Sequence, residues 1–168
     1  MSHTELLVDA FERIRDAVHP AVSGLSADEL AFRPDNESNS IAWLIWHLTR
    51  IQDDHIAGLD GIDQVWTAKG WVDRFALPLP VTDTGYGHGP SDVAAVTADA
   101  PLLLDYFEDV HDKTISFVET LAEADLHRVI DATWDPPVTL GVRLVSVIAD
   151  DLQHVGQAAY VRGILQRR

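Results

Sequence analysis

Cysteine is absent from this chain of 168 residues. The chain therefore cannot form disulfides, thiolate nucleophiles of its own, or cysteine-ligated zinc and iron–sulfur sites. If a thiol takes part in its chemistry, that thiol must arrive as a separate small molecule.

Lysine is also scarce, because only Lys69 and Lys113 occur beside ten arginines. Acidic residues outnumber basic ones, and the formal net charge is −15 at pH 7. Nucleic-acid binding and docking on an anionic membrane both need clustered positive charge. We therefore expect neither nucleic acid nor a membrane as a partner.

Long apolar runs are missing as well, and none approaches the ~20 residues needed to span a bilayer. The N-terminal stretch MSHTELLVDAFERIRDAV carries acidic residues early and lacks the basic start and apolar block of a signal peptide. These features predict a cytoplasmic protein. Its length favours one domain over residues 1–168.

Four long segments have apolar residues at three- and four-residue spacing, which predicts amphipathic helices. They cover about residues 4–24, from 38–40 to about 58, from 99–101 to about 123, and about 140–165. About 40 residues between the second and third segments have no helical period, but their tryptophans and glycines indicate an ordered cover. We predict an all-α fold, an antiparallel four-helix bundle with a long crossover between the second and third helices.

Polar residues interrupt the apolar side of two predicted helices. His47 lies in the second helix, and Asp150, Asp151 and His154 lie in the fourth. Burying these groups is costly unless they are paired or bound to a metal. Asp150 and His154 are four residues apart and share one side of their helix, so both can reach one cation. His47 on a facing helix would supply a third ligand.

Three ligands of the type His, His and carboxylate leave coordination positions open, as in catalytic metal sites. Such a donor set suits Zn, Ni, Fe or Mn. The alternative is that His47 is a hydrogen-bonded core residue and that Asp150 and His154 form an ordinary intrahelical ion pair. The sequence alone leaves both interpretations open.

Other residues are candidates for contacts with a small-molecule substrate. His55 lies two turns from His47, about 12 Å along the helix, so it cannot easily share the same ion. The alternative role for His55 is in a local polar network with Asp54 or Gln52. His88, in the glycine-rich stretch TGYGHGP, is either a turn residue or a group over the pocket. The full set of substrate-binding candidates is His55, Trp66, Trp71, His88 and Asp151, although the tryptophans also suit a core. His3, His19, His111 and His127 are predicted to be solvated.

The stretches NSIAWLIWHLTR and DDLQHVGQAAYVRG resemble the second and fourth helices of the DinB-like superfamily of four-helix-bundle proteins. The related branches include mycothiol-dependent maleylpyruvate isomerase and thiol S-transferases. The resemblance implies that His47, Asp150 and His154 hold a divalent metal, and that mycothiol or a similar thiol is a cofactor. Asp150 departs from the pattern, because members usually carry His or Glu there.

Three functions are compatible with these residues. The first is a metal-dependent enzyme that activates a low-molecular-weight thiol for transfer or isomerisation. The second is a non-catalytic metal- or small-molecule-binding protein, which the Asp150 departure favours. The third is a metal-dependent hydrolase that uses the same ligands. A homodimer is compatible with such a bundle, and the sequence identifies no substrate.

Overall fold

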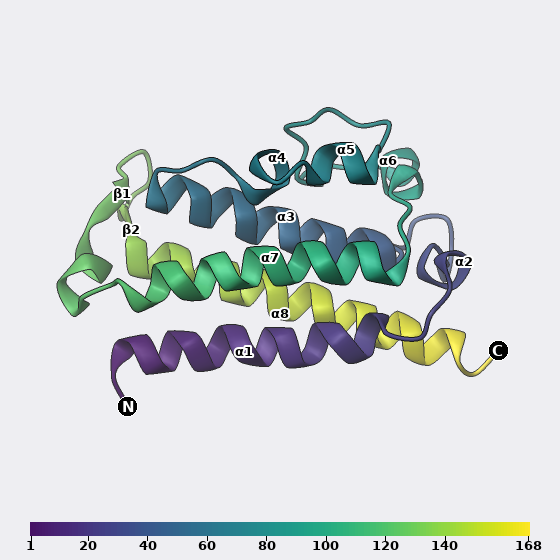
Figure 1. The fold of residues 1–168 in the computed structure, drawn as a ribbon, viewed down its shortest axis with the longest axis horizontal. Helices are drawn as coiled ribbons and strands as arrows, with labels where there is room; N and C mark the ends of the chain where they lie inside the picture. Colours follow the sequence, from purple (N-terminus) through teal and green to yellow (C-terminus); the bar gives the residue numbers. More distant parts are fainter.

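Four long helices form the body of the molecule in a computed structural model that describes residues 1–168 (Figure 1). They are α1 (His3–Val22), α3 (Ile41–Asp60), α7 (Ala100–Glu119) and α8 (Leu140–Leu165). α1 and α3 each pack against both α7 and α8, so they lie diagonally across the bundle. The prediction of an all-α four-helix bundle with a long crossover after the second long helix is confirmed.

The helix directions follow from the long crossover. The chain travels back along the bundle between α3 and α7, and these two helices therefore run the same way (Figure 1). α1 and α8 run the opposite way, and His3 at the start of α1 accordingly lies 3.0 Å from the carbonyl of Leu121, just after α7. α3 and α8 are thus antiparallel neighbours, which lets side chains from both converge.

Capping residues fix the ends of the site-bearing helices. Ser40 accepts a hydrogen bond from the N–H of Trp43 at the start of α3, and Thr139 does the same for Val142 at the start of α8. Gly61, with φ of 72°, ends α3, so the helix runs past Gly58, near which we expected it to end. The predicted limits of the last helix agree with α8.

The crossover contains short helices that the sequence pattern did not reveal, α4 (Val65–Ala68), α5 (Trp71–Phe75) and α6 (Pro90–Ala95). The buried carboxylate of Asp53 anchors this segment to α3. It accepts hydrogen bonds from the N–H groups of Val65 and Trp66 and from the hydroxyl of Tyr106, each at 2.8 Å. An ordered cover was predicted, and Asp53 explains how it is held.

Smaller elements complete the connections. α2 (Ala27–Leu30) begins at a capping box between Ser26 and Glu29. After α7 come η1 (Glu123–His127) and an antiparallel hairpin of β1 (Val129–Asp131) and β2 (Val138–Thr139). The sequence did not predict the hairpin, because strands of two or three residues show no alternation.

The core is a single cluster of 34 buried apolar residues drawn from all the long helices and the crossover. The prediction that His111 is solvated is wrong, because it is only 2% exposed and lies 3.3 Å from Glu12 of α1. His111 shares the buried face of α7 with Phe107, which its ring stacks against. No helix is long and apolar enough to cross a membrane.

Candidate metal site

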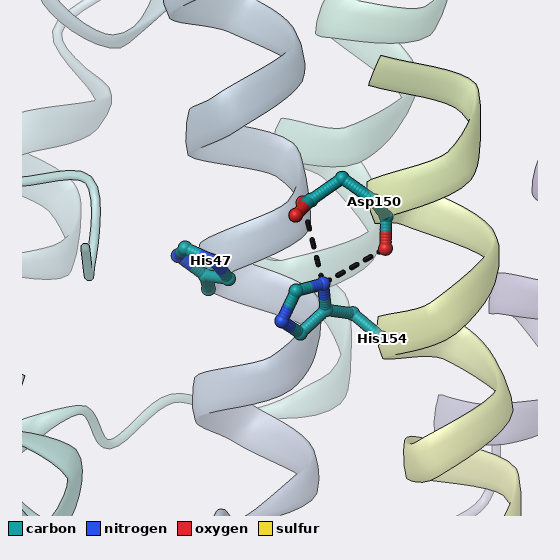
Figure 2. A group of neighbouring side chains, drawn as sticks. All are labelled: His47, Asp150 and His154. Atoms are coloured by element: carbon teal, nitrogen blue, oxygen red, sulfur yellow. Dashed lines mark hydrogen bonds and ion pairs between the residues drawn. The ribbon is translucent and has the colours of Figure 1, made fainter. Parts of the chain in front are cut away.

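His47, Asp150 and His154 converge between α3 and α8 (Figure 2). One potential ligand atom from each residue lies within 4.8 Å of those from the other two. Asp150 and His154 are stacked on successive turns of α8, and His47 faces them from α3. The structure thus brings together the three residues that the sequence singled out.

Backbone carbonyls hold the Nδ1 atom of both imidazoles. Nδ1 of His47 lies 2.5 Å from the carbonyl oxygen of Thr84. Nδ1 of His154 lies 2.8 Å from the carbonyl oxygen of Asp150, a contact drawn as a dashed line in Figure 2. A carbonyl oxygen only accepts, so each Nδ1 must donate its hydrogen. The neutral rings therefore keep a lone pair on Nε2, which is the arrangement that second-shell partners impose on metal-binding histidines.

The Asp150 carboxylate retains capacity to bind a cation. Its Oδ2 atom lies 3.2 Å from Nδ1 of His154, but the hydrogen on that nitrogen is directed at the backbone carbonyl. Oδ2 is buried and accepts no well-aligned hydrogen bond. Two imidazoles and an unsatisfied carboxylate oxygen make a donor set that fits a divalent transition metal.

The electrostatics separate the two histidines. Burial lowers the pKa of His47, although its hydrogen bond to Thr84 opposes this effect. Burial would also lower the pKa of His154, but its contacts with Asp150 outweigh burial and raise it. The pKa of Asp150 is lowered, because its contacts with His154 outweigh the opposing effect of its partial burial. In the metal-free protein, His154 therefore binds a proton more readily than His47.

Solvent reaches the triad from the side of α8. His47 is 5% exposed, whereas the side chains of His154 and Asp150 are 18% and 34% exposed. The crossover covers His47 through Thr84, whereas the side chains of Asp150 and His154 are partly open to solvent.

Gly85 lets the crossover lie directly against His47. Its φ is +95°, and a Cβ atom at this position would lie only 2.5 Å from Nδ1 of His47. Both the backbone conformation and the close approach require glycine. The sequence pattern did not identify Thr84 and Gly85 as site residues; the glycines of the TGYG stretch were the only signal for them.

Trp43 covers His47 and links it to His88. The two rings of Trp43 and His47 stack with centroids 4.5 Å apart, and the indole N–H donates to Nδ1 of His88 at 3.1 Å. Nε2 of His88 must then donate to Asp83, whose Oδ2 lies 3.2 Å away. His88 was expected to contact substrate, but both of its nitrogens are occupied and its role here is to orient Trp43.

The remaining candidates are either buried or lie further along α3. Trp66 and Trp71 are 3% and 2% exposed and pack against Tyr106 in the core of the crossover, and Asp151 is completely buried. These three have almost no surface for a substrate, which corrects the expectation that they line a pocket. His55 lies two turns along α3 from His47 and accepts a hydrogen bond from Arg143 at 3.0 Å.

Comparison with known proteins agrees with this architecture. The DinB superfamily profile matches residues 10–158. The chain belongs to the DinB superfamily. Its structure is similar to the crystal structure of a conserved protein from Enterococcus faecalis, with 34% sequence identity, a TM-score of 0.94, and coverage of 100% of this chain and 99% of the other. No curated protein matches the chain. The DinB resemblance seen in the sequence is confirmed, and neither of these matches names an activity.

Proposed function

We propose that this DinB protein is a divalent-metal-dependent enzyme that activates a low-molecular-weight thiol for transfer or isomerisation. One observation carries the proposal. Two imidazoles with their Nδ1 atoms fixed by carbonyls stand beside a carboxylate oxygen without a hydrogen-bond donor. Three such ligands leave coordination positions for a reacting molecule, whereas structural zinc sites are closed by four protein ligands.

A divalent ion held by His47, Asp150 and His154 would supply Lewis acidity, which favours the thiolate form of a thiol at neutral pH. The ligands suit Zn, Ni, Fe or Mn. The carbonyls of Thr84 and Asp150 keep each histidine in the ligating tautomer. Trp43 shields His47 from water, and the partly open α8 side gives the substrate access.

The choice of a thiol rests on the resemblance of the sequence to the mycothiol-dependent branch of the family. The absence of cysteine is compatible with an external thiol and equally with chemistry that uses no thiol. A metal-dependent hydrolase would use the same three ligands with water as the nucleophile, and a binding protein would use them without turnover.

Thermal-shift measurements on metal-loaded protein test the proposal. Mycothiol, bacillithiol and glutathione are compared, and at least one should raise the melting temperature of the wild type but not that of His154→Ala. The stabilising thiol is then incubated with 1-chloro-2,4-dinitrobenzene, where its sulfur forms a bond to the ring carbon and chloride leaves. If no thiol stabilises the loaded protein, thiol activation is wrong; turnover of an activated ester would then support the hydrolase.

A homodimer remains a prediction. Sedimentation velocity of untagged protein checks it, and a single species of the monomer mass of 18.6 kDa at micromolar concentration would contradict it.

A further inference from the structure

A second polar constellation lies on the same helix pair, toward the hairpin end of the bundle. A cavity of about 540 Å³ is lined there by residues from the end of α3, from the η1–β1 segment and from the start of α8. Its charged and titratable residues are Asp54, His55, Arg128, Asp131 and Arg143. This volume is typical of small-molecule sites.

The two arginines in the cavity have no carboxylate partner. Arg13, Arg15, Arg50 and Arg74 form ion pairs, whereas Arg128 and Arg143, like Arg33 and the three arginines near the C-terminus, form none. Arg143 donates to Nδ1 of His55, and its charge contributes, after the hydrogen bonds from Thr133, to the lowered pKa of Asp131. The cavity thus holds two guanidinium groups that form no direct ion pair with a carboxylate.

The two aspartates of the cavity are engaged elsewhere. Asp54 accepts a hydrogen bond from the side chain of Gln64 at 2.7 Å. Asp131 accepts from both the backbone N–H and the hydroxyl of Thr133, at 2.9 and 2.6 Å. All three of these bonds use Oδ1 alone, and the two negative charges disfavour a doubly charged ligand. The donors of the cavity are the guanidinium groups of Arg128 and Arg143.

His55 adds a third donor. Because its Nδ1 accepts from Arg143, the ring hydrogen must be on Nε2, and no side chain or carbonyl accepts it. Apolar side chains complete the wall, namely Leu59, Val129 and Ile130. Guanidinium groups match a carboxylate geometrically, since two N–H groups can meet its two oxygens.

We propose that this cavity binds the carboxylate of a singly charged substrate with an apolar body, and that Arg143, Arg128 and His55 recognise it. The assignment of this ligand as the substrate rests on the proposed function of the triad. Arg143 lies two turns before Asp150 on α8, about 10 Å along the axis. The substrate therefore carries its reacting atom roughly that far from its carboxylate.

Titration with benzoate, with neutral benzamide as the matched ligand, tests the site in metal-free protein. NMR signals of the Nε–H groups of Arg128 and Arg143 should shift and saturate with benzoate. Benzamide should bind the wild type about tenfold or more weakly than benzoate does. Benzoate should bind Arg143→Gln more weakly than the wild type by a similar factor, because each change removes a charge-assisted hydrogen bond. Arg74→Gln, on an exposed arginine paired with Asp105 elsewhere, should leave benzoate binding unchanged.

Equal binding of benzoate and benzamide would overturn the proposal, as would wild-type affinity in Arg143→Gln. Tighter binding of inorganic phosphate than of benzoate would contradict the choice of a carboxylate. If circular dichroism shows that Arg143→Gln does not fold, the same titration is made on Arg128→Gln, which changes an exposed residue of the cavity. Wild-type affinity of Arg128→Gln for benzoate would then overturn the proposal. The metal content of each variant is measured before the metal is removed for the titration. Loss of the carboxylate site with metal retained is thereby distinguished from failure of the triad.

Discussion

Asp150 is the residue that gives this triad its particular character. Its carboxylate contacts the His154 ring, while its own backbone carbonyl accepts the Nδ1 hydrogen of that ring. One residue thus supplies both a candidate ligand and the group that fixes the tautomer of another. Asp is shorter than the Glu or His expected from the family pattern, so the ion it helps hold must lie close to α8.

Replacing Asp150 with Asn tests the link between Asp150 and His154 in the metal-free protein. The pKa of His154 is raised chiefly by the Asp150 side chain against the effect of burial, so it should fall in the variant. The pKa of His47, which burial lowers, should stay the lower of the two. Histidine NMR titrations measure both.

The stability that this pairing contributes follows from the raised pKa of His154. It is fully present below the ordinary histidine pKa of about 6.5 and is lost as pH rises through the folded-state value. The difference in melting temperature between wild type and Asp150→Asn should therefore shrink across that window. A difference that grows with pH would contradict the assignment.

Asp151 presents a separate titration. Its carboxyl group is completely buried with neither oxygen hydrogen-bonded, and burial raises its pKa well above the usual value. The native state holds this proton more tightly than the unfolded chain, so stability is lost as pH rises above about 3.9. Asp151→Asn cannot ionise at this position, so the variant should exceed the wild type in free energy of unfolding by an amount that grows with pH. Chemical denaturation of the metal-free proteins at pH 5 and pH 8 measures this difference. A variant less stable than wild type at pH 8 would show that the ionised carboxylate is accommodated.

The crossover is the element that completes the site. Gly85 and Gly87 both have positive φ, but only Gly85 has a neighbour within 4 Å of where a Cβ would stand. Gly85→Ala should therefore cost the backbone strain of about 1 kcal/mol and in addition displace His47, whereas Gly87→Ala carries only the strain. Metal affinity, measured by competition with a chromogenic chelator, should fall in Gly85→Ala alone. Equal affinities in the two variants would show that this contact does not position His47.

The same elements show what the sequence could predict. The long helices and the triad follow from periodicity, because His47, Asp150 and His154 interrupt regular apolar stripes. Asp151 interrupts its stripe in the same way, yet it is buried without exposed surface; a helical wheel does not give depth. The short helices of the crossover depend on Asp53, whose partners lie 12 and 13 residues away, and the Arg143–His55 contact joins residues 88 apart. Such contacts follow from the packing of α3 on α8 and leave no local pattern.

At the scale of the whole molecule, the bundle presents two polar sites along one antiparallel helix pair. The triad lies near the middle of α8, and the arginine cavity lies at its start, beside the hairpin. The charge of Asp150 acts to raise the pKa of His55, and His55 acts to lower the pKa of Asp150, so each site contributes to the electrostatic potential at the other. A substrate held by its carboxylate at one end would be presented to the ligands at the other.

Metal content of protein purified without a histidine tag tests the central claim most directly. Elemental analysis after dialysis should give about one divalent ion per chain in the wild type and in His127→Ala, whose histidine lies on the exposed η1 segment. His47→Ala and His154→Ala should each lose the ion, because two remaining ligands hold it poorly. A wild type without bound metal after incubation with Zn, Ni, Fe or Mn, or metal unaffected by both alanine variants, would contradict the account.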